Sequence, residues 1–245
     1  MTSIVRPFIA LYAAMLLLGM SLGLLATFLS LRLTLEGFST QMTGLILTSY
    51  FIGSVVGSLY CSKLIRRVGH IRSFTAFAAL ATAMVMLHGV YISAFAWAVF
   101  RFFTGIATIG LFMVIESWLN ECTLPGIRGR VFSIYMVMCY LGGSIGQQLL
   151  NIGEIQDKTL FFLIGLLLVS CIIPVALTHS IHPEMPQTEP VRFKHILKKA
   201  PMGIMGCFTA GLMSSSFYTM GPVFCHQINL SVSQLSYFMT ITVLG

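Results

Sequence analysis

Apolar runs of about 20 residues recur seven times along this chain of 245 residues. They cover residues 8–31, 43–62, 73–92, 94–119, 131–150, 160–177 and 202–223, and an eighth begins near Gln234. A helix of roughly 20 residues crosses the hydrocarbon layer of a bilayer. The backbone finds no water partner in that layer, and the runs show no strict alternation of apolar and polar residues. We therefore predict an all-α multi-pass membrane protein.

The composition excludes an ordinary soluble domain. Hydrophobic residues make up 57% of the chain and charged residues only 9%, against about 25% charged in soluble proteins. The formal charge of +7 comes from short basic segments between the runs, which predicts contact with membrane lipids and no nucleic-acid partner. The six cysteines form no CxxC pair and the histidines are scattered, so we predict neither a metal site nor a cofactor.

If each run crosses the membrane, the segments between runs lie alternately on its two sides. The basic residues are distributed unequally between these two sides. Only Arg32 and Lys158 fall on one side, and Arg101 lies within the fourth run. Eleven of the 14 Lys and Arg residues share the other side: Arg6, Lys63, Arg66, Arg67, Arg72, Arg128, Arg130, Arg192, Lys194, Lys198 and Lys199. Because cytoplasmic loops are enriched in Lys and Arg, we predict a cytoplasmic N-terminus in a plasma membrane, namely a bacterial inner membrane.

The longest hydrophilic stretch divides the chain. Residues 179–200 contain three prolines and charges of both signs. We expect residues 1–178 to form an N-terminal six-helix bundle and residues 179–200 to form a cytoplasmic linker. Residues 201–245 would then supply the first one or two helices of an incomplete C-terminal bundle.

Three local motifs lie between residues 62 and 130. The first is the basic turn Ile65-Arg66-Arg67-Val68-Gly69-His70-Ile71-Arg72 between the second and third runs. The second is Arg101-Phe102-Phe103-Thr104-Gly105 within the fourth run. The third joins Trp118-Leu119-Asn120-Glu121, across six residues, to Arg128-Gly129-Arg130.

Together these motifs resemble those of the major facilitator superfamily. Arg67, Gly69 and Arg72 match its basic turn, although Arg66 stands where an aspartate is usual and Ser62 replaces a glycine. The second motif is similar to the family's Arg-x-x-x-Gly pattern. The third, the most specific, has the spacing of sugar-porter-type members.

The resemblance implies two six-helix bundles with a solute site between them. Family members usually have twelve spans, whereas this chain stops within its eighth. We therefore expect a fragment or a prematurely terminated reading frame, which needs a second bundle for full function.

We assign two groups of candidate site residues. A charge inside a span normally faces a wet cavity or a partner, which makes Arg101 the leading candidate for the solute path. The alternative is a structural arginine that binds carbonyl groups of a neighbouring helix. The candidates for the solute path or ion coupling are Arg101, Thr104, Thr108, Glu116, Tyr140, Gln147 and Tyr218.

The second group is a cytoplasmic gate implied by the resemblance. Glu121 is expected to pair with Arg128 or Arg130, and with Arg67 across the neighbouring loop. The alternative is a static surface ion pair, worth roughly 0–1 kcal/mol. The gate candidates are Arg67, Gly69, Arg72, Glu121, Arg128 and Arg130.

The function predicted is secondary active transport of a small solute by alternating access, with coupling to a proton or another ion left open. The alternative is a non-transporting remnant or a helix-bundle partner of another membrane protein. No catalytic residues are assigned and no enzyme is expected. The Gly-x-Ser-x-Gly pattern at residues 142–146 lies within a run rather than in the strand–turn–helix that a hydrolase requires.

Overall fold

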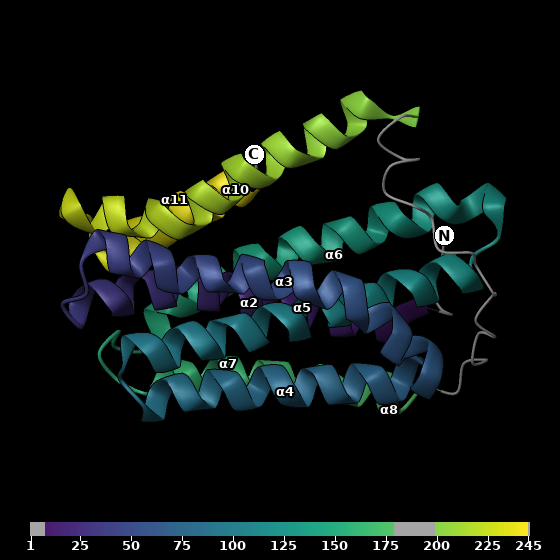
Figure 1. Cartoon of the computed structure of the whole chain (residues 1–245), viewed down its shortest axis with the longest axis horizontal. Coiled ribbons are helices and arrows are strands. Elements are labelled where there is room, and N and C mark those ends of the chain that lie inside the picture. The colour runs from purple at the N-terminus through teal and green to yellow at the C-terminus, as the bar shows by residue number, and fades with distance from the viewer. Residues whose placement is uncertain (1–7, 179–198, 245) are drawn as a thin grey trace.

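The computed structural model describes residues 8–178 and 199–244 and confirms the predicted all-α, multi-span architecture (Figure 1). Most of the predicted linker, residues 179–198, lies outside the described residues. The helices are α2 (Ile9–Leu35), α3 (Thr40–Val68), α4 (His70–Val90), α5 (Ala94–Cys122), α6 (Arg128–Gln148), α7 (Thr159–Ser170), α8 (Ile172–Ala176), α10 (Pro201–Gln227) and α11 (Val232–Leu244). Two 3₁₀ turns, η2 (Pro125–Ile127) and η3 (Leu149–Ile152), flank α6.

Within residues 8–178 and 199–244, five helical segments are long and apolar enough to cross a membrane: α2, α3, α4, α5 and the continuous stretch Thr159–Ala176 of α7 and α8. Helices α6 and α10 are also long, with 21 and 27 residues, but glycine, serine and glutamine dilute their apolar character. Their sequences therefore match helices that are covered by neighbours or line a cavity better than helices surrounded by lipid.

Successive helices run in opposite directions, so the turns gather at two ends (Figure 1). We call one the Arg32 end; it holds residues 36–39, 91–93, 153–158 and 228–231. The other, the Gly69 end, holds Gly69 and residues 123–127. At Gly69 the chain passes directly from α3 to α4 with φ of 88°, a conformation that side chains other than glycine's rarely adopt.

Glycine permits two close helix crossings. A Cβ added to Gly105 of α5 would collide with the Tyr50 carbonyl oxygen of α3, and one added to Gly53 would collide with the Phe102 carbonyl oxygen. At the crossing of α2 and α6, a Cβ on Gly142 would lie 2.5 Å from the Leu16 carbonyl oxygen. The small-residue spacing in these runs therefore serves backbone-to-backbone packing.

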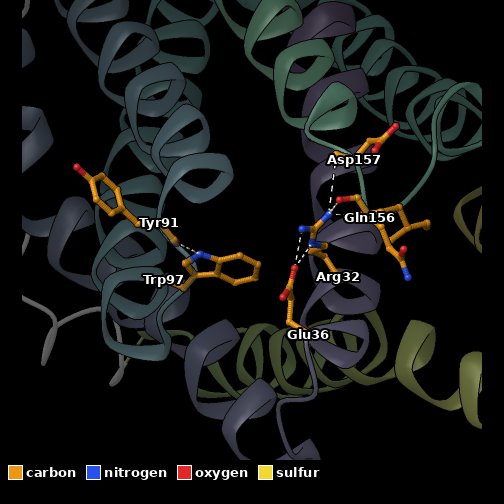
Figure 2. Close-up of polar contacts among 7 residues, drawn as sticks. Arg32, Glu36, Tyr91, Trp97, Gln156 and Asp157 are labelled. Carbon is orange, nitrogen blue, oxygen red and sulfur yellow. Dashed lines mark hydrogen bonds and ion pairs between the residues drawn. The ribbon is translucent and has the colours of Figure 1, made fainter.

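Side chains bind free carbonyl groups at the Arg32 end (Figure 2). The Arg32 guanidinium pairs with Glu36 at 2.6 Å and donates to the carbonyl oxygens of Ile155, at 2.9 Å, and of Gln156. The Trp97 indole donates to the Tyr91 carbonyl oxygen at 2.5 Å. These contacts fix the chain between η3 and α7 against α2, and fix the turn between α4 and α5.

Helix α10 contacts the remaining helices near the Arg32 end and diverges from them toward the Gly69 end (Figure 1). Its buried residues are Pro222, Val223 and Cys225. In contrast, Met202, Phe208 and Met213, nearer its start, are 85%, 62% and 69% exposed. The α10–α11 pair thus meets the first six helical segments at one end only.

Candidate functional site

A cavity of about 330 Å³ lies where α10 and α11 meet the other helices. Helices α2, α3, α5 and α6 form its wall on one side, and Tyr218, Thr219 and Val243 close it on the other. Most of the lining is apolar or aromatic. A concave, mainly apolar cavity with few polar groups is typical of a small-molecule site.

Arg101 is the charged residue of this lining. It lies on α5, is 8% exposed, and its guanidinium carbon is 4.5 Å from the centre of the Tyr50 ring of α3. Among residues 8–178 and 199–244, no carboxylate lies within 4.0 Å of it, and its Nε has no hydrogen-bond partner. The close crossing at Gly105, one turn further along α5, brings Tyr50 next to this guanidinium.

Gln147 reaches the same cavity from α6, but its amide is already engaged. Its Oε1 accepts from Thr27 Oγ1 at 2.6 Å, and its Nε2 donates to the Gly23 carbonyl oxygen at 3.0 Å. Both partners belong to α2, so Gln147 joins the two helices where Gly23 and Gly143 touch. The Gln147 amide therefore stabilises the wall of the cavity and has little hydrogen-bonding capacity left for a ligand.

A match over nearly the whole chain assigns it to a protein family. Residues 11–245 match the model of the Major Facilitator Superfamily. The chain belongs to this family. Its members are transporters of small solutes rather than enzymes.

Relatives agree with the family assignment. The Escherichia coli (strain UTI89 / UPEC) protein named Uncharacterized MFS-type transporter YcaD is 27% identical over 99% of this chain. An Uncharacterized MFS-type transporter of Yersinia pestis (strain Pestoides F) is 29% identical, also over 99%. The chain spans 64% of the length of each of these relatives.

Solved structures show the fold. A mutant of the nucleoside transporter NupG superposes with a TM-score of 0.80 at 13% identity, over 96% of this chain and 64% of that one. A bacterial homologue of the human lysosomal transporter Spinster, inward-facing and unoccupied, gives 0.76 at 12% identity, over 98% and 59%. The chain therefore has the arrangement of about 60% of a superfamily transporter.

The predicted solute-path residues of this superfamily chain fall into two groups. Arg101, Tyr140, Gln147 and Tyr218 line the cavity together, from α5, α6 and α10. The other three do not line it. Thr104 and Thr108 are each 1% exposed within the helix packing, and Thr104 Oγ1 donates to the Phe100 carbonyl oxygen at 2.8 Å.

Glu116 also lies outside the cavity lining. It is an exposed residue of α5, one turn from Phe112, which does line the cavity. Its carboxylate accepts a hydrogen bond from the Tyr135 hydroxyl of α6 at 2.9 Å. The Glu116 carboxylate therefore lies between the cavity and the Gly69 end.

The gate residues share the Gly69 end, but the expected arginine pairing is not formed in this conformation. Glu121 lies 3.8 Å from His70 Nε2 of α4, and His70 also contacts Ser117 Oγ at 3.0 Å. The gate arginines, Arg67, Arg72, Arg128 and Arg130, are all exposed. Arg128 donates to the Asn120 carbonyl oxygen at 3.4 Å. An exposed arginine keeps its hydration, which offsets most of what an ion pair would contribute.

Tyr50 is the site residue that the sequence prediction missed. Nothing in the second apolar run distinguishes it from other tyrosines at span positions. Its role depends on the α3–α5 crossing, which the glycine spacing indicates only as a packing face. Phe51 of the same run, which also lines the cavity, was missed for the same reason.

Proposed function

We propose that this chain forms the N-terminal bundle, the linker and the start of the second bundle of a secondary transporter that moves a small solute by alternating access. The boundaries proposed are residues 1–178, 179–200 and 201–245. The observation that carries the proposal is the cavity, because residues from both sides of the linker line it. In this family of transporters, a cavity between two bundles is where a solute binds.

Access to the cavity differs at the two ends. At the Arg32 end, Gln148 Nε2 donates to Thr240 Oγ1 at 2.6 Å and Asn151 Nδ2 donates to Ser236 Oγ at 2.9 Å, which joins α6 and η3 to α11. Ser30 Oγ likewise donates to the Thr219 carbonyl oxygen of α10 at 3.2 Å. At the Gly69 end α10 diverges (Figure 1). This is the geometry of one state of an alternating-access cycle, closed at one end.

The distribution of Lys and Arg favours a cytoplasmic Gly69 end, and the bacterial relatives favour an inner membrane. The state described is then open toward the cytoplasm. Arg67, Gly69, Arg72, Glu121, Arg128 and Arg130 would form the cytoplasmic gate of the opposite state, when the Gly69 end closes. Glu116 is the candidate for proton or ion coupling because its carboxylate lies between the cavity and that gate.

Editing the host's own gene tests the proposal at the protein's natural length. With Arg101→Gln, at least one small solute should change its distribution between cells and medium, because the cavity has lost its charged group. Untargeted profiling of both compartments measures this change. Lys158→Gln, which also removes one positive charge but from an exposed side chain, lies outside the cavity and the basic turn; it is the matched control and should leave the profile as it was.

Two results would favour the alternative of a non-transporting partner protein. One is an unchanged solute profile in the Arg101→Gln strain while the protein is present in the membrane. The other is an equal change in both variant strains, which would reflect charge alone.

A further inference from the structure

The Arg101 side chain is buried without a counter-ion in the part of the chain that the structure describes. Burying a charge inside a membrane protein costs several kcal/mol unless a partner compensates it, and such residues normally have one. Here the guanidinium has a Tyr50 ring at 4.5 Å and an unpartnered Nε. The ring offsets part of the cost through a cation–π contact, but it carries no negative charge to balance the guanidinium. The cavity therefore presents an uncompensated positive charge that an anionic group of a solute can neutralise.

The rest of the lining restricts what can accompany that anion. Besides Arg101, the described lining residues are uncharged, and many are aliphatic or aromatic, among them Phe51, Phe112, Tyr140 and Tyr218. A second negative charge on the solute would find no cation among the described lining residues. A cationic group would meet the guanidinium with no carboxylate beside it.

Two polar side chains of the lining, Gln147 and Ser30, form hydrogen bonds within the protein itself. Both ends of the Gln147 amide bond to α2, and Ser30 Oγ donates to the Thr219 carbonyl oxygen. A solute hydroxyl placed against these two side chains would be left without a partner, at a cost of about 1–3 kcal/mol. An apolar group of the solute is therefore favoured at this part of the wall.

Building on the proposed function, we propose that the solute class is an organic monoanion: one carboxylate or similar anionic group on an apolar, preferably aromatic, body. The anion binds Arg101, whose planar fork can bind a carboxylate through two parallel hydrogen bonds. The apolar body fills the space between Phe112 of α5 and Tyr218 of α10.

Protection of Cys139 measures occupancy of the cavity directly. Cys139 lines it, and in the protein used for labelling the other five cysteines of this chain, residues 61, 122, 171, 207 and 225, are replaced by alanine. The purified chain in lipid nanodiscs is labelled with a maleimide in the presence of phenylacetate, phenylacetamide or phenethylamine. These probes share a ring and differ in charge. Phenylacetate should protect Cys139 at concentrations about tenfold or more below those needed for the amide, and the amine should not protect.

Variants at Arg101 then assign the preference to the guanidinium. Arg101→Gln should remove the difference between acid and amide, and Arg101→Lys should keep only part of it, because Lys lacks the fork. Lys158→Gln, an exposed site with the same change in charge, should behave as the unaltered chain. The acid–amide comparison needs no substitution at Arg101, so it remains decisive if that variant fails to fold.

The outcomes separate this inference from the proposed function. Equal protection by acid and amide, or stronger protection by the amine, overturns the monoanion class while the cavity still binds a solute. Absence of protection by all three probes also overturns it, and the host-gene experiment then decides the proposed function on its own. Conversely, selective protection by phenylacetate together with an unchanged host profile would leave an anion site without transport.

Discussion

Replacing Gly105 with Ala is expected to lower the free energy of unfolding by about 1–3 kcal/mol or more, because the added Cβ enters a backbone-to-backbone contact. It would collide with the Tyr50 carbonyl oxygen and lie 2.9 Å from the Ser54 nitrogen. Neither atom can move without separating α3 from α5. Because Tyr50 covers Arg101, the same change should also weaken binding in the cavity.

Gly211→Ala is the matched control. Gly211 lies in helix α10 with no atom within 4 Å of an added Cβ. The intrinsic preference of a helix for alanine then applies without a steric cost, so stability should stay the same or rise slightly. Thermal unfolding of both variants in the same detergent measures the difference. Equal stability of the two variants would mean that α3 and α5 are not in the close contact described.

Arg32→Ala is expected to cost about 2–4 kcal/mol of stability, because several charge-assisted contacts are lost at once. The variant leaves Glu36 without its cation and leaves the Ile155 and Gln156 carbonyl oxygens without their donor (Figure 2). The segment between η3 and α7 would then lose its attachment to α2. Proteolysis between residues 153 and 158 should become faster along with the loss of thermal stability.

Lys158→Ala controls for the loss of one positive charge at the same end. Lys158 is exposed and makes no ion pair among the described residues. Its substitution should change stability by no more than about 0.5 kcal/mol. The loss of stability in Arg32→Lys should lie between those of the other two variants. The ammonium can still pair with Glu36 but has no planar fork with which to reach two carbonyl groups. If Arg32→Ala is as mild as Lys158→Ala, these contacts contribute little to the fold.

The helical architecture was predictable because the bilayer fixes both the length and the apolar character of a span. The position of Arg101 in the cavity lining was predictable for a related reason, since an ionised group inside a span is costly unless it faces a cavity or a partner. Tyr50 was not predictable, because its importance comes from an α3–α5 crossing that brings residues far apart in sequence together. The pairing of Glu121 with an arginine stays a prediction for the opposite state. Motif spacing places these charges at one end, but in this conformation Glu121 lies 3.8 Å from His70 and the gate arginines are exposed.

The proposed transport cycle depends most on a solute cavity that opens toward the Gly69 end, the end proposed to face the cytoplasm. Labelling of Cys139 as the single cysteine, with a membrane-impermeant maleimide, tests this claim from both sides of the membrane. We predict fast labelling in inside-out vesicles and slow labelling in intact cells, because Gln148, Asn151 and Ser30 close the Arg32 end. Faster labelling in intact cells than in inside-out vesicles would contradict the account.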